Sequence, residues 1–238
     1  MFTLRKATDR GHTNLGWLDS HHTFSFGGYQ DPKHTNFGPL RVINDDVVTP
    51  SGGFGEHPHR DMEIMTWVLS GVLKHGDSLG NLKSLKPGEL QVMTAGSGIR
   101  HSELNGSDTD PVHLLQVWII PRAQGVMPRY DQRTLSAEGR DHQWQLLAAD
   151  DSETDRFEEN TMPLAQSARF LVADLKPGRP LAYQFESGRS GWLHLATGKA
   201  SAAGHDLSAG DALAITGEDS IELTASEPAQ AILFDLAD

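Results

Sequence analysis

Short β-type segments separated by glycine and proline run through the whole sequence, and this pattern limits the possible folds most strongly. Two examples are residues 63–69, which end before Ser70-Gly71, and residues 114–120, which end before Pro121. No segment has the long 3.6-residue periodicity of an amphipathic helix. Short strands at regular spacing, with turns of this kind between them, are typical of sandwiches and barrels. The sequence therefore predicts an all-β protein.

One turn sequence occurs twice. Residues 85–89 (LKPGE) and 207–211 (LSAGD) share a leucine, a glycine and a final acidic residue at the same spacing. An internal repeat would explain the match and would give two β-barrels of similar plan. The alternative is an accidental match, because turns that combine glycine with an acidic residue are common. The polar, acidic stretch at residues 125–159 is expected to contain the boundary between the barrels.

Two motifs carry candidate metal ligands: HPH at residues 57–59 and HSE at residues 101–103. Side chains two residues apart on a strand point to the same face. If the two strands are neighbours in one barrel, all four ligands converge inside it. Three imidazoles and a carboxylate suit a borderline divalent metal. The candidate ligands are His57, His59, His101 and Glu103.

Other polar residues near these motifs are weaker candidates. Asp61 and Glu63 continue the alternation after His59, so they could reach the same interior, and Gln116 is a further candidate to accept a proton from a ligand imidazole. The scattered histidines are expected on the surface or in the core and not as ligands. They are His21, His22, His34, His75, His142, His194 and His205.

The motifs and their flanks resemble the pirin family of two-cupin proteins. The resemblance is dense over residues 1–132 and weak beyond them. Like pirins, the chain has the second-motif histidine two residues later than in the general cupin pattern, and Thr94 where proline is usual. The segments that carry the resemblance are GH at 11–12, GWL at 16–18, TFSF at 23–26, RVINDD at 41–46, GEHPHRDME at 55–63, AGSGIRHSE at 95–103, LQVW at 115–118 and PRY at 128–130.

The resemblance implies a bicupin, in which two jelly-roll-like β-barrels pack together. An N-terminal cupin domain at residues 1–132 would hold one divalent metal, with Fe(II) expected and Ni, Cu, Mn or Zn possible, through His57, His59, His101 and Glu103. A C-terminal cupin-like domain at residues 133–238 would hold none. The repeat agrees, because none of the four matching positions keeps the ligand. Ala182 and Gln184 match His57 and His59, and Leu223 and Ala225 match His101 and Glu103.

Bacterial pirins of this kind are known to cleave flavonols such as quercetin with dioxygen, so the resemblance implies a quercetin 2,3-dioxygenase-type oxidoreductase. A 3-hydroxy-4-keto flavonol would chelate the metal, and Glu103 would take the hydroxyl proton as general base. The alternative is a non-enzymatic regulator whose metal or redox state controls binding to a transcription or metabolic protein. A metal-dependent isomerase and a closed, purely structural zinc site are further alternatives.

Charge and composition limit the partners. The chain has 20 basic and 32 acidic residues, a net charge of −12, and no cysteine. Such a surface repels a phosphate backbone, so direct binding of nucleic acid is not expected. The absence of cysteine excludes disulfides and thiolate ligands. No apolar signal or membrane-spanning stretch is evident. We expect a cytoplasmic monomer that takes a small planar chelator and dioxygen, without a membrane partner.

Overall fold

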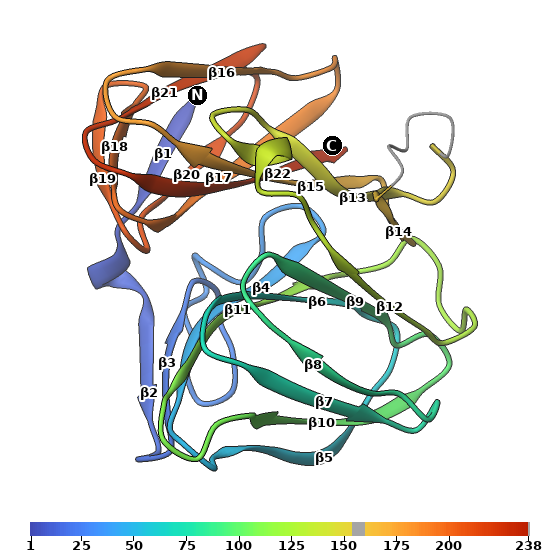
Figure 1. The fold of residues 1–238 in the computed structure, drawn as a ribbon. Coiled ribbons are helices and arrows are strands. Elements are labelled where there is room, and N and C mark those ends of the chain that lie inside the picture. The colour runs from blue at the N-terminus through green and yellow to red at the C-terminus, as the bar shows by residue number, and fades with distance from the viewer. Residues whose placement is uncertain (154–159, 238) are drawn as a thin grey trace. The chain divides into compact units, whose positions relative to one another are not determined.

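The computed structural model describes residues 1–153 and 160–237. Strands make up nearly all of the regular structure in this part of the chain (Figure 1), and the remainder is two short 3-10 turns, η1 (Ala7–Asp9) and η2 (Glu138–Arg140). Among the described residues, no helix is long and apolar enough to cross a membrane. The prediction of an all-β fold is confirmed.

The chain divides into two compact units. The N-terminal unit comprises Gly11–Leu135 with Leu164–Gln166, and the C-terminal unit comprises Met1–Arg10, Ser136–Pro163 and Ser167–Asp238. The first ten residues thus group with the C-terminal half, whereas the expected division after residue 132 placed them in the N-terminal domain. As a statement about independently folding domains, that division stays a prediction.

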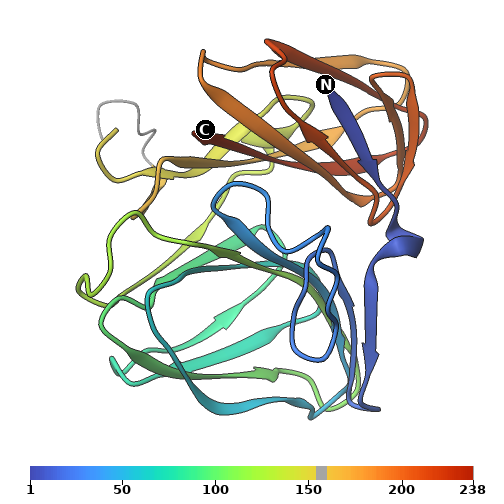
Figure 2. The ribbon, with the colours of Figure 1, turned by 180° about the vertical axis from the view of Figure 1, so that it is seen from behind.

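The N-terminal unit contains two antiparallel sheets that face each other (Figure 2). The seven-stranded sheet has the order β12-β9-β6-β11-β4-β3-β2, and the four-stranded sheet has the order β5-β10-β7-β8. The strands are β2 (Gly11–Asn14), β3 (Leu18–His22), β4 (Leu40–Val48), β5 (Gly53–His59), β6 (Glu63–Ser70), β7 (Leu73–Asp77), β8 (Leu82–Leu85), β9 (Glu89–Thr94), β10 (Ile99–Asn105), β11 (Val112–Ile119) and β12 (Arg129–Thr134).

The C-terminal unit repeats this plan. Its sheets have the orders β1-β20-β17-β22-β15-β13-β14 and β16-β21-β18-β19. The strands are β1 (Phe2–Arg5), β13 (Gln145–Asp150), β14 (Met162–Leu164), β15 (Ala168–Leu175), β16 (Pro180–Gln184), β17 (Arg189–Thr197), β18 (Lys199–Ala202), β19 (His205–Ser208), β20 (Ala212–Ile215), β21 (Ser220–Ala225) and β22 (Ala229–Ala237). Strand β1 pairs with β20 in the place that β12 takes beside β9.

The repeated turn lies at the same point of both units. It joins β8 to β9 in one unit and β19 to β20 in the other. Gly88 and Gly210 both have φ of 84°, a left-handed conformation that favours glycine. The acidic residue closes each turn, since Glu89 accepts the Lys86 backbone N–H and Asp211 accepts that of Ser208. The turn sequence is therefore a repeated structural device.

The strand pairings correct part of the repeat alignment. The constant spacing had matched Glu103 with Ala225. Following the pairings from the repeated turn, Leu223 takes the place of Glu103 and Ile221 takes the place of His101. Loop lengths differ between the units, so a single spacing cannot align both sides of a turn. Leu223 and Ile221 are buried in the apolar core of the C-terminal unit.

Candidate metal centre

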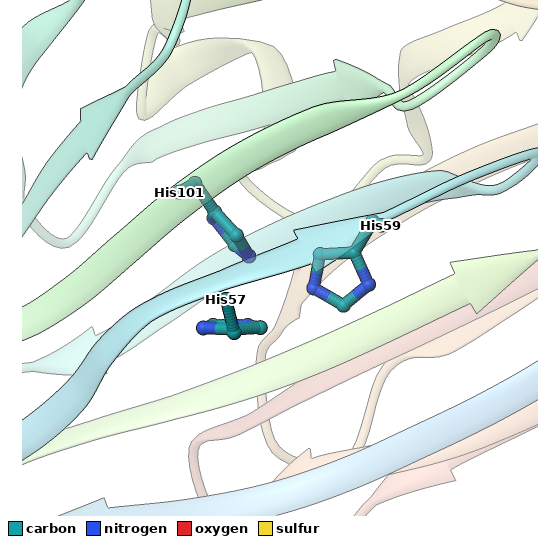
Figure 3. A group of neighbouring side chains, drawn as sticks. All are labelled: His57, His59 and His101. Carbon is teal, nitrogen blue, oxygen red and sulfur yellow. The ribbon is translucent and has the colours of Figure 1, made fainter.

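Strands β5 and β10 are direct neighbours in the four-stranded sheet of the N-terminal unit. They pair antiparallel, with His57 opposite His101 and His59 opposite Ile99. Residues that face each other in an antiparallel pair project on the same side, as do residues two apart on one strand. Figure 3 shows His57 and His59 on one strand and His101 on its neighbour, with the three rings gathered together.

The three imidazoles lie close enough to share one ion. The ring centroid of His101 is 4.5 Å from that of His57 and 4.8 Å from that of His59. One nitrogen from each ring falls within 4.8 Å of the other two. The His57 Nδ1 lies 2.8 Å from the Gly55 carbonyl oxygen, which can accept its proton and so fix its tautomer.

Glu103 lies two residues beyond His101, on the cavity side of β10. The pairing of β10 with β5 shifts between these two residues, so that Glu103 faces Phe54. Its carboxylate accepts hydrogen bonds from Gln116 Nε2 at 2.6 Å and from the Thr66 hydroxyl at 3.2 Å. Glu103 is buried, and Gln116 and Thr66, which belong to the seven-stranded sheet, hold its side chain in place.

The electrostatics of these side chains suit metal ligation. Burial, with a smaller contribution from the charge of His57, lowers the pKa of His59 to about 4 and that of His101 to about 3. Both rings are therefore neutral at pH 7, as ligands must be. Both nitrogens of His101 are buried and have no hydrogen-bond partner in the described part of the chain. An unpartnered buried imidazole is costly, and a bound metal would satisfy it, so the residues fit a divalent ion.

Burial has the opposite effect on Glu103. It raises the pKa of this carboxyl to about 7, although the hydrogen bonds from Thr66, Gln91 and Gln116 lower it. A dication beside Glu103 would favour the charged carboxylate, because opposite charges stabilise each other in a poorly solvated site.

A cavity of about 340 Å³ opens beside these residues. His57, His59, His101 and Glu103 all line it. Trp118, Phe26 and Phe54 supply aromatic surface, and the polar wall is formed by Thr13, Ser20, His22, Asn44, Asp46 and Gln116. A volume of this size lies within the range for small-molecule sites in proteins, roughly 300–1,000 Å³. Phe24 is buried in the core, whereas Phe26 and Phe54 face the cavity.

The whole chain matches proteins of one family. Residues 3–119 match the family model described as Pirin, and residues 152–236 match the one described as quercetinase C-terminal cupin domain. The quercetin 2,3-dioxygenase of Escherichia coli K12 is 43% identical over 99% of both chains. The chain belongs to the pirin family. A pirin-like protein of Caulobacter vibrioides is 39% identical over 98% of this chain and 99% of its own.

Solved structures of pirins agree with the fold. The structure of the bacterial pirin YhhW from Escherichia coli in complex with nickel(II) has a TM-score of 0.92 and 42% identity, and the match covers 100% of this chain and 99% of that one. This likeness confirms the predicted bicupin fold and the resemblance that led to it. The relative from Escherichia coli O157:H7, also named quercetin 2,3-dioxygenase, is 43% identical over 99% of both chains.

Of the weaker candidates, Asp61 and Glu63 lie outside the cavity of this pirin and Gln116 lies in its wall. Asp61 accepts the backbone N–H of Gly125 at 2.6 Å, and Glu63 accepts the hydroxyl of Thr94 at 3.0 Å. Neither belongs to the set of residues that line the cavity. Gln116, in contrast, does reach the site, where its Nε2 donates to Glu103 and its Oε1 accepts the Thr66 hydroxyl and not the proton of a ligand imidazole.

Sequence reasoning did not single out His75. This residue is buried on β7, and one of its nitrogens lies within 4.8 Å of a nitrogen of His101 and an oxygen of Glu103. The clue in the sequence was His75-Gly76-Asp77, another pair of polar residues two apart on a strand. Its pairing with β10 brings it to the site, and such a long-range pairing was not read from the sequence.

Proposed function

We propose that this pirin is a metal-dependent dioxygenase that cleaves flavonols with dioxygen. Its divalent metal would be held by His57, His59, His101 and Glu103. Fe(II) is the proposed native ion, and Ni, Cu, Mn and Zn are ions that the same donors would accept, since affinity for such a donor set does not by itself select the functional metal. The nickel(II) complex of the Escherichia coli relative supports a divalent ion.

The observation that carries the proposal is the cluster of three imidazoles at the wall of a small-molecule cavity. A closed structural zinc site would have no need for such a space. The cavity has aromatic surface at Trp118, whose ring meets that of His59 edge-on with centroids 4.9 Å apart. A planar chelating ligand could therefore contact the aromatic wall and the metal together.

A divalent metal bound here would supply Lewis acidity toward the hydroxyl and keto oxygens of a flavonol and reactivity toward dioxygen. Glu103 would accept the proton of the flavonol 3-hydroxyl, in addition to its role as a ligand. Burial makes this carboxyl a stronger base than a free glutamate, which favours uptake of the proton, whereas a bound dication would lower its pKa again. Gln116 and Thr66 fix the orientation of this carboxylate through their hydrogen bonds.

The polar wall would bind the other substrate hydroxyls. The Asp46 Oδ1 atom is buried and has no hydrogen-bond partner within residues 1–153 and 160–237, so it can accept a hydrogen bond from a ligand. His22 is fixed beside it, with Nδ1 2.8 Å from the Asn44 side-chain oxygen and Nε2 2.9 Å from the Thr13 hydroxyl. A polyhydroxylated flavonol offers a donor that matches the Asp46 acceptor.

The test is to load the protein separately with Fe(II), Ni(II), Cu(II), Mn(II) and Zn(II) and to add quercetin with and without dioxygen. We expect loss of flavonol absorbance and release of carbon monoxide only when a redox-competent metal and dioxygen are both present. The His101→Ala variant serves as the control for free metal. If no metal form consumes quercetin in a dioxygen-dependent way, the proposed activity is wrong.

A further inference from the structure

His75 and Asp77 approach the metal centre from the opposite side to β5. Strand β7 pairs antiparallel with β10, so that Asp77 lies opposite His101 and His75 lies opposite Glu103. The side chains of His75 and Asp77 therefore project on the same side of the sheet as the two ligands. Both side chains are completely buried.

Asp77 is held rigidly and in turn fixes His75. The Asp77 Oδ1 atom accepts the backbone N–H groups of Leu79 and Asn81 at 2.9 and 3.0 Å. Its Oδ2 atom lies 2.9 Å from His75 Nε2. A carboxylate can only accept, so the proton of the neutral imidazole resides on Nε2. The Tyr130 ring stacks on the imidazole with centroids 4.7 Å apart, which fixes its plane.

Among the residues that the structure describes, three buried nitrogens have no hydrogen-bond partner where the rings of His75 and His101 meet. They are Nδ1 of His75 and both nitrogens of His101. The ring centroids are 5.4 Å apart, and one nitrogen of each ring lies within 4.8 Å of the other. With its proton on Nε2, His75 presents a lone pair at Nδ1. An imidazole that binds a metal through one nitrogen has one N–H left to donate.

We propose that Asp77 and His75 form a hydrogen-bonded chain that positions His101, with His75 Nδ1 accepting the N–H of the His101 nitrogen that does not bind the metal. His75 and Asp77 are positioning residues. Their chain fixes the tautomer and the plane of His101 and increases its donor strength, as outer-sphere acceptors do for metal-bound histidines. This inference rests on the metal centre of the proposed function but not on flavonol cleavage.

Two substitutions of His75 separate the effect of its acceptor atom Nδ1 from the effect of its aromatic ring. His75→Phe keeps a ring against Tyr130 and removes Nδ1, whereas His75→Asn places an amide oxygen near the former Nδ1. We expect His75→Phe to weaken binding of Zn(II) and Fe(II) by about 10–100-fold, the usual effect of losing an outer-sphere partner. His75→Asn should recover most of that loss. The measurement is competition with a chromophoric chelator.

Asp77→Asn tests the tautomer. The side-chain oxygen stays with the N–H groups of Leu79 and Asn81, so the amide donor faces His75 Nε2. The His75 proton must then move to Nδ1, where it opposes the N–H of His101. We expect weakened metal binding although every side chain keeps its size. In the iron protein, both Asp77→Asn and His75→Phe should raise the Fe(III)/Fe(II) midpoint potential, because a weaker donor stabilises Fe(III) less.

Nitrogen-15 NMR of the zinc-loaded protein measures directly which imidazole nitrogens in the hydrogen-bonded chain carry protons. We expect one protonated nitrogen on His101, proton-bridged to an unprotonated Nδ1 of His75, and loss of this pattern in Asp77→Asn. Wild-type metal affinity and potential in His75→Phe, or a zinc-bound His75, would overturn the inference. Failure to bind metal at all would overturn the proposed function as well. A protein that binds metal through this chain but cleaves no flavonol would overturn the proposed function alone.

Discussion

His57 lies directly opposite His101 across the paired strands β5 and β10, and the centroids of their imidazole rings are 4.5 Å apart. The backbone pairing of two strands distant in sequence thus creates the core of the candidate site. Each ring depends on the other strand for its position. Changes to a ring and changes to the pairing are therefore expected to have separable effects on metal binding and on folding.

His101→Ala should remove one ligand while the fold persists. We expect metal affinity to fall by more than the ~10–100-fold that loss of an outer-sphere partner costs. The metal-free variant should still unfold cooperatively, at a moderately lower urea concentration than the metal-free wild type, because the substitution deletes a buried ring that already borders the cavity. Metal content by elemental analysis and urea unfolding measure the two effects. His205→Ala, on β19 of the C-terminal unit, is the control, and wild-type metal content in His101→Ala would contradict the ligand assignment.

Gly53→Ala should disturb the strand pairing that brings the ligands together. A Cβ at Gly53 would lie 2.5 Å from both the Glu103 carbonyl oxygen and the Leu104 Cα, and its φ of 153° is unfavourable for alanine. We expect the unfolding free energy to drop by about 2–4 kcal/mol and metal affinity to fall with it. Gly55→Ala in the same strand is the matched control, since a Cβ there meets nothing within 4 Å. Equal stability of the two variants in urea would refute this account.

The sequence predicted correctly those features of the site that depend on residues close together in the chain. The alternation of His57 with His59, and of His101 with Glu103, follows from the two-residue period of any strand. The histidine cluster needed one further assumption, that the two strands are neighbours, and the structure pairs them. The predicted role of Glu103 as a ligand remains a prediction. The structure places it on the same cavity wall, hydrogen-bonded to Gln116.

What escaped the sequence depends on pairings between distant segments. His75 gains its position from the pairing of β7 with β10, which its own neighbours in sequence do not encode. The pairing of β1 with β20 is similar, because a four-residue strand carries too little pattern to specify its partner. The register shift between His101 and Glu103 is a third case. Irregularities of this kind depend on packing against both neighbouring strands.

Trp118→Ala should weaken substrate binding without removing the metal. The indole lines the cavity and meets the rings of His59 and Phe26 edge-on, with centroid distances of 4.9 and 5.4 Å. An aromatic pair contributes about 0.5–1.5 kcal/mol beyond burial, so the Kd for a flavonol should rise by up to about tenfold. Trp118→Phe should retain most of the affinity. Anaerobic fluorescence titration of the metal-loaded protein is the measurement, and unchanged affinity in Trp118→Ala would place the ligand elsewhere.

Asp46→Asn should change how stability depends on pH in the metal-free protein. Burial raises the pKa of Asp46 to about 7, the charge of Asp45 adds to this, and the bond from Ser20 opposes it. The folded state therefore holds this proton more tightly than the unfolded state, in which the pKa is about 3.8. The stabilisation is complete below about pH 4 and is lost as the pH rises through about 7.

The wild type should accordingly lose stability relative to Asp46→Asn between pH 4 and 8, by as much as ~4 kcal/mol if the full shift is expressed. The titrations of His59 and His101 occur in both proteins and largely cancel in the difference, whereas that of Glu103 cancels only in part, because the charge of Asp46 raises its pKa. Urea unfolding at a series of pH values measures this difference, with Ser187→Ala at an exposed turn of the C-terminal unit as the control. Parallel pH curves for wild type and Asp46→Asn would contradict the raised pKa and would show that Asp46 is ionised in the folded cavity at neutral pH.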